Sequence, residues 1–294
     1  MNKRKNKINA YDIVINLILI LVAMICLLPF IHVLAVSLSN SVEVMKGAVL
    51  FWPKEFTLSS YVYIIRRVTF WKTFGVSVKR VILGVSLNFI IAILTAFPIS
   101  RSKDQFKYRS FFTWYLFITM IFNGGMIPNY MVIKETRLIN SIFALVIPTS
   151  VRVFGILVLY NFFKNVPSEI DDAADLDGAS PWTLLFRIYL PISLPALATI
   201  VLFFTVYHWN SWFDGILYMN RIEKMPLQSY LQTILIKEDI SQLEDITDYK
   251  IIMETNNQTL KSAQIVVACI PVMALYPFLQ KYFIKGIMLG SVKG

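Results

Sequence analysis

The polar stretch EIDDAADLDGASPWTLLFRIYLP, residues 169–191, has the residue types and spacing that point most directly to a function. Carboxylates at its start favour the positively charged N-terminal end of a helix for which Ser168 would be the N-cap. Gly178 can end this helix in the left-handed conformation. Ser180 would then cap a second short helix with Pro181 as its first residue, where no backbone N–H is needed. Two short helices joined by a turn suit docking onto another protein.

The spacing within this stretch resembles the cytoplasmic EAA loop of ABC-importer permeases, in which E-A-A is followed by three residues, a glycine, nine residues and I-x-L-P. The matching positions here are Asp172, Ala173, Ala174, Gly178, Ile188, Leu190 and Pro191. Aspartate stands where the family has glutamate, so the carboxylate is carried on a shorter stem. These fixed positions favour a coupling loop over residues 165–191. The alternative is an amphipathic loop that only connects two membrane spans.

The composition excludes an ordinary soluble domain. Hydrophobic residues make up 56% of the chain, charged residues make up 16%, and the mean hydropathy is +0.61. Apolar runs of about 20 residues are long enough to cross a bilayer as helices. The 28 basic and 18 acidic side chains give a net charge of +10, which could suggest nucleic acid. Much of the positive charge lies in short segments between the apolar runs, where it sets orientation, so no nucleic-acid partner is expected.

Six apolar runs predict an all-α polytopic membrane protein with six transmembrane helices. The predicted spans are residues 13–38, 76–99, 111–131, 142–163, 191–213 and 263–283. The basic start MNKRKNK places residues 1–11 in the cytoplasm, and the first run is too long for the apolar region of a signal peptide. Residues 12–294 then form one transmembrane domain with both termini in the cytoplasm. This order puts the EAA-like loop in the cytoplasm and residues 214–259 in an outer loop.

Two segments are expected to depart from regular spans, and two basic residues lie near a membrane surface. Residues 40–71 combine aromatic and basic side chains, which favours a helix lying at the membrane interface over an ordinary loop. Lys79 and Arg80, near the start of the second span, can extend to the outer head groups. Two glycines and a proline in residues 122–130 should break the third span, either as part of a transport pathway or as a simple kink.

Aromatic and hydrogen-bonding side chains concentrate at the outer end of the fifth span. The candidate pathway residues are Tyr207, Trp209, Asn210 and Trp212, with Arg152 in the fourth span. Aromatic rings stack on the C–H faces of sugars, and amides and phenols bond to hydroxyl groups, so a transient sugar site is one interpretation. The other is an aromatic belt at the outer head groups. An arginine at this depth either faces a partner or a cavity, or extends to the interface.

No residues suggest a metal, redox or catalytic site. Cys26 and Cys269 lie inside predicted spans and are expected to be small buried apolar residues, and His32 and His208 are far apart in the sequence. The chain has no G-x-x-x-x-G-K-[ST] motif to hold nucleotide phosphates, so it is not expected to be an enzyme. No cofactor is expected on this chain, and ATP and Mg²⁺ would bind to a partner ATPase.

Along nearly its whole length, the chain resembles the permease subunits of type I ABC sugar importers of the maltose-permease type. Its tail, residues 283–294, is typical of the permeases for oligosaccharides and polysaccharide fragments. The resemblance implies a bacterial inner-membrane protein that pairs with a second, homologous permease. It also implies two ATPase domains on the cytoplasmic side, an extracellular binding protein that delivers the sugar, and contact with membrane lipid.

The resemblance further implies roles within the coupling loop. The residues assigned to ATPase coupling are Glu169, Asp172, Ala173, Ala174, Gly178, Ile188, Leu190 and Pro191. Asp172 would contact an arginine of the ATPase, the alanines would leave space for close packing in the ATPase groove, and Gly178 would provide the turn. The last three residues would anchor the loop to the fifth span.

Two other functions stay open at this point. A type I permease for another solute would share the EAA loop, although the tail favours sugar. An ion-coupled secondary transporter would be expected to show an inverted repeat, paired broken helices and intramembrane acids, which we do not find in the sequence. Arg152, together with Lys79 and Arg80, favours an acidic glycan such as a uronate-containing oligosaccharide.

Overall fold

The computed structural model describes residues 10–236 and 257–290, and every regular element in these two ranges is a helix. The chain forms two compact units, one of residues 1–67 and 238–270 and the other of residues 68–237 and 271–294. The long helix α16, Asn257–Gly290, contributes to both units. Residues 291–294 of the predicted tail and residues 237–256 of the predicted outer loop lie outside the described part.

The first unit is built on helix α1, Ala10–Ser37. Its apolar side chains are exposed over most of its length, as expected for a helix whose surface is left for lipid or another protein. Cys26 of this helix is exposed and Cys269 of α16 is half-buried, so the expectation that both are buried is wrong. Two short helices follow, α2 at Ser41–Met45 and α3 at Ser59–Arg66, within the segment predicted to lie at the membrane interface. The Ser37 hydroxyl shares a 2.7 Å hydrogen bond with the Tyr61 hydroxyl, which ties the end of α1 to α3.

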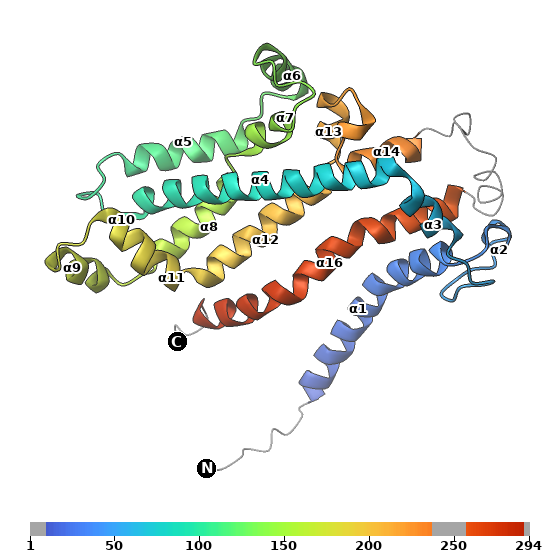
Figure 1. Ribbon diagram of the computed structural model, residues 1–294. Helices are drawn as coiled ribbons and strands as arrows, with labels where there is room; N and C mark the ends of the chain where they lie inside the picture. Colours follow the sequence, from blue (N-terminus) through green and yellow to red (C-terminus); the bar gives the residue numbers. More distant parts are fainter. Residues whose placement is uncertain (1–9, 237–256, 291–294) are drawn as a thin grey trace. The chain divides into compact units, whose positions relative to one another are not determined.

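The second unit is organised around helix α4, Val68–Ser100, which packs against α8, Val153–Lys164, and α12, Leu194–Asn210 (Figure 1). Glycines allow the close approach of these helices. A Cβ atom on Gly84 of α4 would lie 2.4 Å from the His208 ring of α12, and one on Gly155 of α8 would lie 2.4 Å from the Phe204 ring.

Three of the predicted spans are bent pairs of helices. Helix α5, Arg109–Ile121, and α6, Met126–Glu135, meet at 111°. Helix α7, Phe143–Val146, with the 3-10 turn η1, Ile147–Thr149, meets α8 at 45°. The segment of α10, Pro181–Thr183, the π-helix η2, Leu184–Tyr189, and α11, Leu190–Ile192, meets α12 at 81°.

Each predicted span corresponds to one of these elements. Among the described residues, two continuous helices are long and apolar enough to cross a membrane, and the three bent pairs raise the number to five if each counts as one span. Helix α16 covers the predicted sixth span. The break in the third span is also present, with Gly125 at φ +86° as the residue before α6.

The described part of the predicted outer loop is helical. It contains α13, Phe213–Tyr218, the 3-10 turn η3, Ile222–Lys224, and α14, Leu227–Ile236. Tyr218 and Met219 pack in a buried apolar cluster with Leu145 of α7. A segment of mixed polarity is therefore folded onto the bundle, because its apolar residues cover the broken helices beside it.

Candidate functional site

The segment predicted to couple to an ATPase, residues 165–191 (the coupling segment), begins with helix α9, Ser168–Leu176. The predicted N-cap at Ser168 is wrong. Pro167 has the extended backbone that precedes the helix, Ser168 is the first helical residue, and no side chain caps this end. The predicted end of the helix is confirmed, because Gly178 has a φ of +68° and the next residue, Ala179, donates its N–H to the Ala174 carbonyl at 2.9 Å.

The second half of the segment starts as predicted. The Ser180 hydroxyl accepts a 3.2 Å hydrogen bond from the Thr183 N–H, and Pro181 is the first residue of α10. The helix then widens into the π-helix η2, which buries Leu185 and Tyr189. This widened turn brings the coupling segment back onto the core of the second unit.

Assigned coupling residues fall into an exposed and an inward-facing set. Glu169, Asp172 and Ala173 are exposed. Ala174 is only 6% exposed and belongs to the core cluster of this chain, against which Ile188 and Leu190 also pack. Ala174 therefore cannot pack in a partner's groove in this conformation, and its small size serves the packing of α9 on its own unit. Of the two alanines, only Ala173 is left for a partner. The remaining assigned residues, Gly178 and Pro191, are exposed.

Sequence reasoning missed three exposed, large apolar side chains on the same segment. Leu176 is 90% exposed, and Trp182 and Phe186 are 62% and 55% exposed. The Trp182 and Phe186 rings stack with centroids 6.0 Å apart. Large apolar side chains within an otherwise polar stretch were the signal that could have revealed them.

Asp171 is a further residue that the sequence did not single out. One of its oxygens accepts a 2.9 Å hydrogen bond from Arg101, and the other accepts a 2.8 Å hydrogen bond from the Tyr189 hydroxyl. Arg101 follows the end of α4, so this carboxylate connects α9 with two other elements.

Three of the candidate pathway residues line one cavity of about 640 Å³. The full set of polar and aromatic residues lining it is Asn123, Asn129, Thr149, Tyr207, Asn210, Ser211, Trp212, Phe213, Asp214 and Tyr218. Residues 122–130 therefore contribute to a cavity wall and are more than a kink. Trp209 lies elsewhere, because it points to another side of α12, is 4% exposed and packs edge-on against Phe74.

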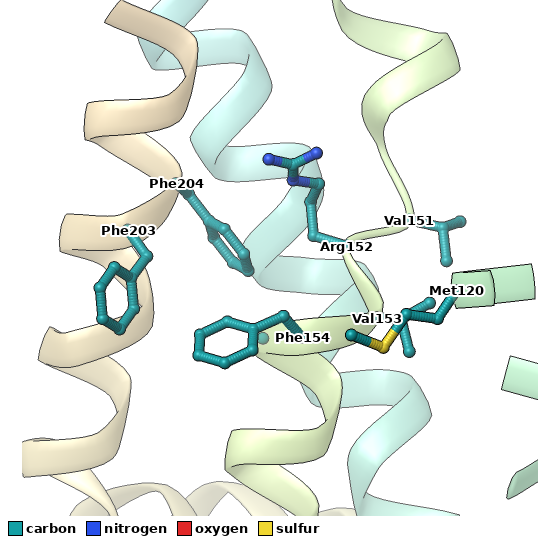
Figure 2. A pocket seen from close by; sticks show the side chains of 8 residues that line it. Met120, Val151, Arg152, Val153, Phe154, Phe203 and Phe204 are labelled. Atoms are coloured by element: carbon teal, nitrogen blue, oxygen red, sulfur yellow. The ribbon is translucent and has the colours of Figure 1, made fainter. Parts of the chain in front are cut away.

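Arg152 precedes α8 at the bend of the fourth span and lines a second cavity of about 330 Å³. Its guanidinium carbon lies 3.2 Å from the centre of the Tyr207 ring. Figure 2 shows the guanidinium pointing away from the apolar side chains that form the rest of this cavity, including Met120 and Phe154. None of the ion pairs among the described residues involves Arg152.

The prediction that Arg80 extends to the head groups is wrong. Its side chain is fully buried and donates to both carboxylate oxygens of Asp214, the first at 2.9 Å, and to the Ser211 carbonyl at 3.2 Å. A counter-charge from α13, which the sequence did not reveal, allows the arginine to stay buried. Lys79 is exposed. Arg80 is therefore neutralised within the chain and no longer supports an anionic substrate.

The side chains of His208 and Asn88 form a hydrogen-bond network at the bend beside Arg152. His208 Nε2 lies 2.6 Å from Asn88 Oδ1, and the Asn88 amide donates to the carbonyls of Thr149 and Ser150 at 2.8 and 2.6 Å. The histidine thus has a structural partner. Within residues 10–236 and 257–290, no group of three or more potential metal ligands occurs.

Comparison with known proteins identifies the family of this chain. The profile of the family described as "Binding-protein-dependent transport system inner membrane component" matches residues 73–289. The chain is 40% identical to the polygalacturonan/rhamnogalacturonan transport system permease protein YtcP of Bacillus subtilis, over 99% of this chain and 100% of that protein. It is 36% identical to protein LplC of the same organism, over 93% of this chain and 91% of that protein.

A solved structure of a similar transporter has the same fold as this chain. The similar chain belongs to a bacterial ABC transporter involved in the import of the acidic polysaccharide alginate. The two chains are 28% identical and superpose with a TM-score of 0.82, covering 96% of this chain and 99% of that one. This chain therefore belongs to the family of binding-protein-dependent transport system inner membrane components, the membrane-spanning permease subunits of ABC importers in which separate subunits hydrolyse ATP.

Proposed function

We propose that this permease translocates an acidic oligosaccharide, such as a uronate-containing fragment, that an extracellular binding protein delivers. The observation that carries this proposal is Arg152, a cation with no ion-pair partner among the described residues, held on Tyr207 beside a polar and aromatic cavity. The similar permease named for polygalacturonan and the similar transporter of alginate both handle acidic glycans, which supports the same substrate class here.

The arrangement of Arg152 suits a carboxylate. The aromatic ring under the guanidinium orients it without using its N–H groups, so these can bind both oxygens of a carboxylate. Helix α8 begins directly after Arg152 and has no capping side chain, so its positive end adds to the same field. Asn123, Asn129 and Asn210 on the neighbouring cavity can bond to sugar hydroxyls.

The coupling segment would face the cytoplasm, with both termini on the same side, as the distribution of basic residues favours. There Asp172 would contact an arginine of the ATPase, and Leu176, Trp182 and Phe186 would lie against an apolar part of it. The complex would contain a second permease and two ATPase domains, which bind ATP and Mg²⁺. Closure of the ATPases would then move the coupling segments and alternate the access to the pathway.

The test compares one oligosaccharide in two charge states. The complex is reconstituted with its binding protein, and ATP hydrolysis is measured with oligogalacturonates and with the same oligosaccharides after reduction of their carboxyl groups. We expect stimulation by the acidic form in the wild type and a loss of about tenfold or more in Arg152→Gln, with Arg152→Lys intermediate because lysine lacks the bidentate fork.

Lys79→Gln is the matched control, because it removes an exposed cation from α4. Equal stimulation of wild type and Arg152→Gln by the acidic form would overturn the role of Arg152. Stimulation only by the neutral form, or by neither, would assign the permease to another solute.

A further inference from the structure

We propose that Asp171 is a positioning residue that fastens the coupling helix α9 to the end of α4, so that both helices move as one body during transport. The proposal rests on the docking of the coupling segment onto an ATPase. It assigns to Asp171 a role inside the permease, whereas the neighbouring Asp172 faces outward.

The two oxygens of Asp171 are bound by donors from different elements. Arg101 Nη1 donates to one at 2.9 Å, and the Tyr189 hydroxyl donates to the other at 2.8 Å. Arg101 directly follows α4, and Tyr189 is the last residue of η2. A single carboxylate on α9 thus connects the end of α4 with the second half of the coupling segment.

The arginine of this pair depends on Asp171 for its counter-charge. Arg101 is 9% exposed, and its guanidinium lies 4.6 Å from the centre of the Phe97 ring and 4.2 Å from that of the Tyr189 ring. Its own carbonyl is held by Arg109 at 2.7 Å. A buried guanidinium enclosed by rings has lost much of its water, so removing its carboxylate leaves an unpaired charge.

The surroundings of this pair are rigid. The Phe97, Phe163 and Tyr189 rings come from α4, α8 and η2 and pack edge to face, with centroids between 5.4 and 6.3 Å apart. All three are buried. Packed elements of this kind change arrangement as units and do not deform gradually. A displacement of α9 is therefore passed to α4, which packs along both α8 and α12.

The first experiment separates coupling from docking. In the reconstituted complex, Asp171→Asn keeps the shape of the side chain and removes its charge. We expect the ATPase subunits to copurify and to hydrolyse ATP, while the amount of sugar imported per ATP falls by about tenfold. Tyr189→Phe, which removes one of the two hydrogen bonds, should give a smaller loss. Asp104→Asn, on an exposed carboxylate in the neighbouring loop, is the control.

A second measurement does not depend on the substrate. Spin labels at Asp175→Cys on α9 and Leu83→Cys on α4, with Cys26 and Cys269 replaced by serine, report the distance between the two helices. We expect the same narrow distribution in the nucleotide-free and ATP-bound complexes of the wild type, and a broadened distribution in Asp171→Asn. A distance that changes between the two states of the wild type would overturn the proposal, whatever sugar the permease carries.

A double variant covers the case in which Asp171→Asn fails to fold. Arg101→Gln with Asp171→Asn removes both charges, so no buried charge is left unpaired, but the connection stays weakened. We expect this variant to assemble with low import per ATP. Normal import per ATP in the double variant, or loss of ATPase binding in a well-folded Asp171→Asn complex, would contradict the positioning role.

Discussion

Adjacent side chains of the same type serve different purposes in this permease. Asp171 faces the interior and Asp172 the exterior, and Ala174 is buried while Ala173 is exposed. Residue type and spacing predicted the coupling segment, but they could not divide its members between internal packing and contact with a partner. That division depends on which side of α9 packs against the core. In a short helix with few apolar residues, the sequence has no clear apolar stripe to mark the buried side.

Gly84 gives the first prediction, at the scale of one residue. Gly84→Ala should destabilise the complex by about 1–3 kcal/mol, because the new methyl group would overlap the buried His208 ring, which Asn88 holds in place. Thermal unfolding of the purified complex measures the effect.

Gly75→Ala on the same helix is the control, because nothing lies within 4 Å of the added carbon. It should be neutral or stabilising by about 0.5–1 kcal/mol, since alanine has a higher helix propensity than glycine. Equal effects of the two substitutions would show that the close approach of α4 and α12 does not depend on Gly84.

At the scale of elements, the sequence predicted the spans well because long apolar runs and helix-breaking residues are local signals. The turn of the coupling segment was also predictable, since Gly178 and Pro181 act through their own backbone and the Ser180 hydroxyl caps a residue only three positions away. The pair of Arg80 with Asp214 was not predictable. These residues lie 134 positions apart, and no periodicity shows which helix supplies a counter-charge.

The turn at Gly178 gives a prediction of its own. Gly178→Val should uncouple ATP hydrolysis from uptake and leave membrane insertion unchanged, because a β-branched residue strongly disfavours a φ of +68°. The space around this glycine is open, so the effect would come from the backbone alone. Uptake and ATP hydrolysis are measured together in the reconstituted complex.

Gly178→Asn is the matched control, since asparagine tolerates the left-handed conformation. It should retain most of the coupling. Uptake in Gly178→Val equal to that of the wild type would show that the turn has no part in coupling.

At the scale of the second unit, two buried arginines lie along α4, Arg80 within the helix and Arg101 directly after its last residue. Arg80 is paired with Asp214, which lines the larger cavity, and Arg101 is paired with Asp171 of the coupling helix. The same helix therefore joins the wall of the candidate pathway to the segment proposed to dock onto the ATPase. Each buried guanidinium requires a counter-charge, which Asp214 and Asp171 supply.

The last prediction concerns the pair of Arg80 with Asp214. Asp214→Asn should destabilise the complex by about 3–5 kcal/mol, because the fully buried guanidinium would lose its counter-charge. Arg80→Met with Asp214→Leu should recover much of this loss, since no charge stays buried without a partner. Melting temperature and yield of the complex measure both effects.

The exposed pair of Lys72 with Glu223 is the matched comparison in the same unit. The hydrogen bond from Lys72 lowers the pKa of Glu223, but water surrounds both groups, so Glu223→Gln should leave the melting temperature unchanged. If Asp214→Asn were as harmless as Glu223→Gln, Arg80 would have to reach water or another anion in the assembled complex. The pair of Arg80 with Asp214 would then not connect α4 to the cavity wall. Only the pair of Arg101 with Asp171 would connect α4 to an element proposed to act in transport.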